Sequence, residues 1–313
     1  MEERIVGRFE GQERGPLFVV LGAIHGNEPA GVRALELMFK MLEVEPITNP
    51  GFVYRGRMIG LVGNLRAYRE GVRYLRQDMN RCWTRTNWQF VQELPVSERV
   101  AEEREMVELI DVIQQEIADY RPEVMYVLDL HTTSAPGGIF CVVADRKRPF
   151  EIALDMNVPV ITGLTRGLDG TTVDFFRSRN LPVKTHAVVF ESGGHHEPLS
   201  VNRAIAAIAN CMRSIGAVNE HDIESIHDQV LRQSTKELPH LSHLMYTHRV
   251  SEEVNFRMRP GYVNFQEIEQ GEYLADDRHG PVLAPMSGRI LMPLYQRRGS
   301  DGFFIIQEQE EPA

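Results

Sequence analysis

The fold of this chain is constrained most by short apolar runs that alternate with amphipathic segments. The first of these runs is bounded by glycine and proline, a pattern typical of a buried strand in a parallel sheet. The runs cover residues 16–23, 58–64, 124–130, 138–144 and 186–192. Apolar residues at helical spacing follow Pro29 and recur over residues 98–119 and 199–213. Strands that alternate with helices predict an α/β layer fold.

The last part of the chain has a different pattern. From about residue 245, short β-like runs such as GYVNF, GEYLA and GSDGFFIIQ are separated by glycine-rich turns. A polar, helix-compatible stretch at 219–240 separates the two patterns. We therefore predict an α/β domain over residues 1–240, in which 218–240 is a connector, and a small β-rich domain over residues 241–313.

The charge balance limits the partners of the protein. The 313 residues include 44 acidic and 34 basic side chains, a net charge of -10. General binding of a phosphate backbone requires a positive surface, so we expect no nucleic-acid partner. A homo-oligomer is compatible with the sequence.

The cysteines and the apolar content bear on the location of the protein. Cys82, Cys141 and Cys211 are odd in number and show no C-x-x-C spacing, so we expect reduced thiols rather than a disulfide framework or thiolate metal site. The first residues lack the apolar segment of a secretion signal, and no run of 18 apolar residues occurs. The expectation is a cytoplasmic protein without a membrane segment.

The loop after the first apolar run carries the first candidate ligands. Its sequence, GAIHGNEPAG, places His25 and Glu28 three residues apart where the strand is expected to end. Ligands of open α/β sheets gather at the carboxyl ends of strands. A capping glutamate beside a surface histidine would give the same spacing, so a metal site requires a third ligand. The loop lacks G-x-G-x-x-G, which argues against dinucleotide binding.

His131 is the candidate for that third ligand. It ends the run VMYVLDLH, where a second buried strand is expected to end. By itself it would be interpreted as a hydrogen-bonded histidine at a loop entrance. Two imidazoles and one carboxylate are the ligands of catalytic zinc in carboxypeptidase-like enzymes, with a fourth position open. Asp129 could orient an imidazole or be a plain sheet-edge carboxylate.

Glu191 is the candidate general base. A zinc hydrolase needs a group that takes a proton from the metal-activated water and passes it to the leaving nitrogen. Glu191 ends the run HAVVFE and precedes Ser192-Gly193-Gly194, so a strand would deliver it to the same edge of the sheet. The alternative is a solvated glutamate at a strand end.

Arginines are concentrated in the segment GNLRAYREGVRYLRQDMNRCWTR. Arginine recognises carboxylates through two parallel hydrogen bonds and can stabilise an oxyanion. Several of these side chains must be ordinary surface charges. We favour Arg73, Asn80 and Arg81 as functional residues.

Taken in order, GAIHGNEPAG, GVRYLRQDMNR, LDLHTT and VVFESGG resemble the succinylglutamate desuccinylase and aspartoacylase family, relatives of the zinc carboxypeptidases. The resemblance covers roughly residues 16–200, and APMSGRI at 284–290 is similar to the family's C-terminal domain more loosely. It implies a zinc-carboxypeptidase-like mixed sheet flanked by helices in a catalytic domain over residues 1–240. It also implies a zinc-dependent amidohydrolase, a deacylase that cleaves the amide bond of a small, acidic N-acyl amino acid.

The resemblance also implies roles for single residues. His25, Glu28 and His131 would bind one zinc ion, and Glu191 would act as general base and then as acid. Arg73 would stabilise the oxyanion. Asn80 and Arg81 would hold the α-carboxylate of the substrate.

The sequence departs from the aspartoacylase pattern after Glu191, where it reads ESGGHHEP. The family's contacts to the second substrate carboxylate have no match here. Arg166 and Arg177 are assigned no role, and His195 and His196 are expected to be exposed in a loop. A second metal site is not expected at His240, His243 and His248.

Two other functions use the same residues. A metallocarboxypeptidase would need the same zinc site and the same carboxylate contacts, but its substrates would be peptides. A non-catalytic protein that binds zinc or a metabolite would have no need for the proton shuttle at Glu191.

Overall fold

The structure is a computed structural model that describes residues 3–144, 147–166, 168–177, 180–219, 222, 226–251 and 255–310, without the side chains of residues 166 and 226–228. Within these ranges, eleven strands form one sheet. In spatial order they are β1 (Ile5–Glu10), β3 (Arg55–Val62), β2 (Glu13–Gly22), β4 (Val124–Thr133), β7 (Lys184–Gly194), β5 (Ile139–Val142), β6 (Val160–Thr162), β8 (Leu241–Arg249), β14 (Asp301–Glu308), β13 (Gly288–Leu291) and β10 (Glu267–Ile268).

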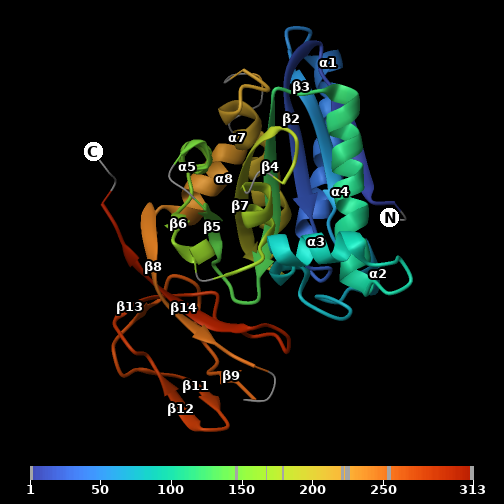
Figure 1. Cartoon of the computed structure of the whole chain (residues 1–313). Coiled ribbons are helices and arrows are strands. Elements are labelled where there is room, and N and C mark those ends of the chain that lie inside the picture. Colours follow the sequence, from blue (N-terminus) through green and yellow to red (C-terminus); the bar gives the residue numbers. More distant parts are fainter. Residues whose placement is uncertain are drawn as a thin grey trace.

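The sheet is mixed. Strands β3, β2, β4 and β7 run parallel to one another, whereas β1 and β5 pair antiparallel with β3 and β7. Helices lie on both sides of it (Figure 1). The expected α/β fold, a mixed sheet flanked by helices, is confirmed.

Strand β2 shows why the parallel strands are apolar throughout. Phe18 and Val20 belong to a core shared with α1 (Ala30–Thr48), α5 (Arg148–Asp155) and α7 (Ser200–Ser214). Leu17 and Val19 belong to a second core shared with α4 (Ala101–Tyr120) and α6 (Thr172–Arg177). Because successive side chains point to opposite faces, a strand covered on both faces has no polar alternation.

Several elements were not expected from the sequence. Strand β1 is an edge strand whose residues are mostly half-buried or exposed, so it lacks a continuous apolar run. Strand β6 has three residues, too few for a periodic signal. The short helices α2 (Leu65–Glu70), η1 (Met79–Arg81), α3 (Arg85–Glu93) and η2 (Leu164–Arg166) were not expected either. Helix α8 (Ile226–Thr235) lies in the stretch at 219–240 that was described as helix-compatible.

The C-terminal part of the chain extends the large sheet. Strand β8 pairs in parallel with β6, so the sheet continues past residue 240, and β14, β13 and β10 follow. A separate sheet contains β9 (Arg257–Met258), β11 (Tyr273–Asp277) and β12 (Gly280–Leu283). These red strands lie beyond one end of the helical layers in Figure 1. The division into two domains stays a prediction, and residues 220–221 and 223–225 of its connector lie outside the described ranges.

None of the helices in the described ranges has the length and apolar character needed to traverse a lipid bilayer.

Candidate active site

The candidate residues lie at one edge of the sheet because their strands are parallel. Gly22 at the end of β2 is in register with Leu130 of β4, and His131 is in register with Glu191 of β7. The carboxyl ends of these three strands therefore meet at the same edge, as parallel strands require. The loop that follows β2 carries His25 and Glu28 over this edge.

Gly26 in the loop after β2 and Gly31 in the first turn of α1 allow close packing against neighbouring segments. A Cβ atom on Gly26 would lie 2.1 Å from the carbonyl carbon of Ala67, and the Gly26 N–H donates to the carbonyl of Arg73 (3.1 Å). A Cβ atom on Gly31 would lie 2.9 Å from the Cβ of Leu130. The loop is thereby held against both the arginine-rich segment and β4.

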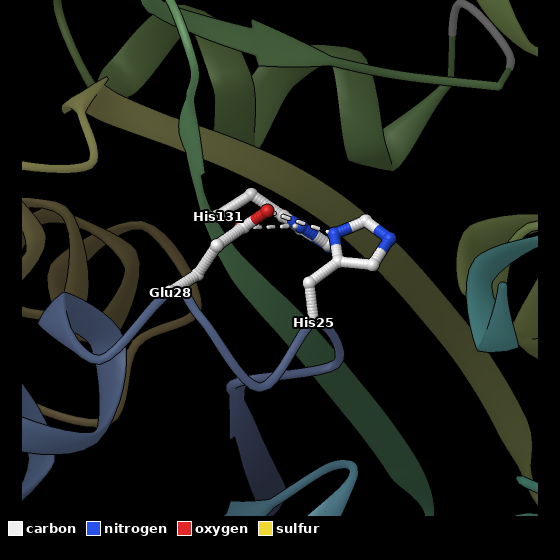
Figure 2. A group of neighbouring side chains, drawn as sticks. All are labelled: His25, Glu28 and His131. Atoms are coloured by element: carbon white, nitrogen blue, oxygen red, sulfur yellow. Dashed lines mark hydrogen bonds and ion pairs between the residues drawn. The ribbon is translucent and has the colours of Figure 1, made fainter. Parts of the chain in front are cut away.

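His25, Glu28 and His131 come together as a buried group (Figure 2). The Nδ1 atom of His25 lies 2.8 Å from Oε1 of Glu28, and the Nδ1 atom of His131 lies 3.2 Å from Oε2. The ring centroids of the two histidines are 5.2 Å apart. Two imidazoles therefore approach the two oxygens of one carboxylate.

This group fits a zinc ion. One ligand atom from each residue lies within 4.8 Å of the others, and zinc bonds to nitrogen or oxygen are about 2 Å long. The far ring nitrogens face carboxylates: Nε2 of His25 is 3.0 Å from Asp78, and Nε2 of His131 is 3.0 Å from Asp129. The hydrogen bond to Asp78 holds the proton on Nε2 of His25 and leaves Nδ1 available to a metal, whereas the contact of His131 with Asp129 is an ion pair without hydrogen-bond geometry.

The charges around the group favour ionised carboxylates. Burial raises the pKa of Glu28, but the imidazoles of His25 and His131 outweigh it and hold that pKa well below its usual value. The pKa of Asp78 is likewise held low by His25 and Arg73 against the effect of burial. A metal ligand must be deprotonated, and Glu28 meets that condition.

Asp78 is a candidate functional residue that the sequence analysis missed. Its Oδ2 accepts hydrogen bonds from Nε (3.3 Å) and Nη2 (3.0 Å) of Arg73, and its Oδ1 accepts from the backbone N–H of Asn80 (2.9 Å). Together with its contact to His25, this one carboxylate connects a candidate metal ligand to two candidate substrate contacts. Its place within the motif RQDMNR is the only signal that could have identified it.

Arg73 lies beside the candidate metal group. Its Nη1 is 3.5 Å from Oε1 of Glu28, and its side chain is 13% exposed. Asp78 thus holds the guanidinium next to the Glu28 carboxylate, in the same cavity as Glu191.

Asn80 and Arg81 both line the same cavity. The side-chain oxygen of Asn80 accepts from the backbone N–H of Thr172 (3.0 Å), so its NH₂ group is the donor that remains for a ligand. Arg81 donates through Nη1 to the carbonyl of Asn80 (2.7 Å) and through Nη2 to Asp301 (2.5 Å). Two of its five N–H donors are thus engaged. Asp301 was not anticipated from the sequence.

Glu191 lies on β7 with 7% exposure and also lines the cavity. Among the described residues, its Oε2 atom has no hydrogen-bond partner. Burial raises the pKa of Glu191 to about 8, against the opposing charge of His131. A pKa near neutrality suits a group that takes up and then releases a proton.

The cavity has a volume of about 110 Å³, enough for several water molecules or a small ligand. One wall comes from the C-terminal part of the chain and contains Met292, Leu294, Gln296, Gly299, Ser300, Asp301 and Phe304. The site is therefore narrowed by residues more than 100 positions away from Glu191 along the chain.

The other residues considered from the sequence lie elsewhere. His195 was expected to be exposed but is half-buried beside the cavity, because its Nδ1 lies 2.7 Å from the hydroxyl of Thr132, a residue of the lining. His196 is exposed, as expected. Arg177 is exposed and pairs with Asp174, and the side chain of Arg166 lies outside the described part. His248 stacks on Phe303, with 4.8 Å between ring centroids.

The sequence of the chain is similar to that of known proteins. Residues 14–215 match the family model for the succinylglutamate desuccinylase/aspartoacylase catalytic domain. The chain belongs to this family. A probable aspartoacylase of Nostoc sp. is 28% identical over 140 residues, which are 43% of this chain and 41% of that protein. The matched part is thus less than half the length of this relative.

Solved structures with the same fold include several desuccinylases. The succinylglutamate desuccinylase of Vibrio cholerae superposes with a TM-score of 0.62 at 17% identity, covering 95% of this chain and 82% of that one. The ectoine utilization protein EutE of Ruegeria pomeroyi gives 0.64 at 15% identity, covering 96% and 87%. The desuccinylase of Chromobacterium violaceum gives 0.62 at 18% identity, covering 99% and 96%.

Replacing Asp78 by asparagine tests its part in the site. We expect zinc affinity to fall about 10–100-fold, because the neutral amide no longer fixes the proton on Nε2 of His25. Zinc affinity is measured by competition with a chromophoric chelator. Asp119→Asn, on the exposed side of α4, is the control. Unchanged affinity in Asp78→Asn would remove the residue from the metal site.

Proposed function

We propose that this protein is a zinc-dependent hydrolase that cleaves the amide bond of a small N-acyl amino acid. The observation that carries the proposal is the approach of two histidine Nδ1 atoms to one carboxylate, in a cavity also lined by Glu191 and Arg73. Membership of the desuccinylase/aspartoacylase family supports the same reaction class.

His25, Glu28 and His131 are the residues that would hold the zinc ion. When bound, zinc acts as a Lewis acid that polarises the acyl carbonyl and makes water a stronger nucleophile at neutral pH. Asp78 and Asp129 keep the two imidazoles oriented from behind. In turn, the hydroxyl of Thr172 donates a hydrogen bond to Asp129.

Glu191 would move the proton. Its carboxylate takes a proton from the attacking water and transfers it to the amide nitrogen, which then leaves as an amine. The buried, unpartnered Oε2 atom and the raised pKa both suit this role.

The arginines would bind the negative charges of the substrate. Arg73 faces the position of the developing oxyanion, and its hold on Asp78 keeps it there. The NH₂ group of Asn80 and the remaining donors of Arg81 would bind the α-carboxylate. The products are a carboxylic acid and a free amino acid.

A metallocarboxypeptidase would share the metal ligands but needs room for a peptide. Residues of the segment 292–304 line one side of the cavity, whose volume of about 110 Å³ favours small substrates. We expect the zinc-containing protein to release acid from N-acetyl or N-succinyl amino acids and to leave dipeptides and tripeptides intact. Amine release is measured by a ninhydrin-type assay, with metal analysis of the same sample. Faster cleavage of tripeptides would favour the peptidase.

A further inference from the structure

The part of the cavity beyond the polar groups has an apolar lining. We propose that the amino-acid side chain of the substrate is apolar and that this lining binds it. The inference rests on the proposed function, because it names the side chain of the N-acyl amino acid. The lining, called the apolar wall below, consists of Val142, Leu164, Leu168, Val173, Val189 and Phe304.

The apolar wall is a built part of the fold. Its six residues are each no more than 8% exposed and all belong to the core cluster on the α4 side of the sheet. They come from β5, β7, β14, α6 and the segment around η2. A cavity surface assembled from five elements has a fixed shape, so it can select among side chains.

The wall adjoins the residues assigned to the α-carboxylate. The backbone N–H of Thr172 donates to Asn80, and the N–H of Trp83 donates to the carbonyl of Gly170 (3.0 Å). Residues 168–173, which carry Leu168 and Val173, are therefore held against the Asn80–Arg81 turn. The side chain of an amino acid branches from the carbon that bears the α-carboxylate, so it would meet this segment.

The charges of the cavity disfavour a second substrate carboxylate. Of the cavity side chains that the structure describes, Arg73 and Arg81 carry a full positive charge, and each already faces a carboxylate, Asp78 (3.0 Å) or Asp301 (2.5 Å). Asp301 itself lines the cavity and adds negative charge. Among the described residues, a carboxylate placed against the apolar wall would lose its hydration without gaining a cationic partner, which is strongly unfavourable.

A comparison of N-acetyl-leucine with N-acetyl-aspartate tests the proposal. The two side chains have the same branching and nearly the same size, so they differ mainly in charge. We expect kcat/KM to be at least about 100-fold higher for N-acetyl-leucine, because an apolar site cannot compensate the lost hydration of the aspartate carboxylate. Equal or faster hydrolysis of N-acetyl-aspartate, or of N-acetyl-lysine, overturns the proposal.

Binding to the zinc-containing Glu191→Gln protein separates this inference from the proposed function. Calorimetry is expected to give at least about tenfold tighter binding of N-acetyl-leucine than of N-acetyl-aspartate. If the unaltered protein hydrolyses neither compound but this preference persists, the hydrolase proposal is wrong and the apolar wall stands. If hydrolysis and the preference are both absent, both proposals are wrong.

A variant of the wall gives an independent readout. Leu168→Ala is expected to lower kcat/KM about tenfold for N-acetyl-leucine and less than about twofold for N-acetyl-alanine, because only the longer side chain reaches the wall. Leu37→Ala, at an exposed position of α1, is the control. Equal losses for both substrates would show that Leu168 does not contact the side chain, and would overturn the assignment of the wall.

Arg166 is tested separately, because it follows the cavity residue Thr165 and its side chain lies outside the described part. Arg166→Met is expected to leave the ratio of kcat/KM for the leucine and aspartate compounds unchanged. A rise of more than about tenfold in this ratio would identify Arg166 as a cation for an acidic side chain and would overturn the proposal.

Discussion

Replacing Glu191 by glutamine is expected to lower kcat about 10³-fold or more while the protein keeps its zinc. Glutamine has nearly the same shape, so the strand and the cavity are preserved, but its amide cannot take a proton from water at neutral pH. Among the described residues, no hydrogen bond joins Glu191 to a candidate ligand atom, and its Oε2 atom has no hydrogen-bond partner. Its loss should therefore affect proton transfer rather than metal binding.

The measurement combines steady-state kinetics on an N-acyl amino acid with metal analysis of the same preparation. Glu93→Gln, at the exposed end of α3, is the matched control and should retain full turnover. If Glu191→Gln turned over substrate at the normal rate, Glu191 would have no part in the reaction. If it lost its zinc, the residue would belong to the metal site instead.

Replacing His131 by alanine is expected to abolish zinc binding and to reduce turnover by more than the ~10–100-fold typical of a residue that only orients a ligand. The change removes one of two imidazoles and leaves Glu28 without one of its partners in a buried site. A ligand that binds only the folded state stabilises it by about 2.7 kcal/mol at a concentration 100 times its Kd. Zinc should therefore raise the Tm of the unaltered protein but not that of His131→Ala.

The control for this variant is His196→Ala, which removes an exposed imidazole from the loop after β7. It should keep both its zinc and the rise in Tm. Retention of stoichiometric zinc by His131→Ala would mean that the metal is held elsewhere, and the proposed function would lose its basis.

The candidate ligands illustrate how much of the site could be anticipated. His25, Glu28 and His131 each follow a strongly apolar run, so their positions at strand ends could be predicted from local pattern alone. Their convergence requires β2 and β4 to be parallel neighbours, which they are. The roles of Asp78 and Asp301 could not be predicted, because they depend on contacts with His25, 53 residues away, and Arg81, 220 residues away.

The sequence by itself determined the α/β fold, the positions of the buried strands along the chain and the chemical types of the candidate ligands. These properties depend on apolar periodicity and on residues that are close together in the chain. A strand covered on both faces is apolar along its length, whichever strands pair with it. Only the tertiary structure decided which face of each strand meets the cavity, that Asp301 engages Arg81, and that six apolar side chains form the wall beside Asn80. Side chains from β5, β7, β14 and α6 become neighbours only when the sheet is assembled, and no local pattern carries that information.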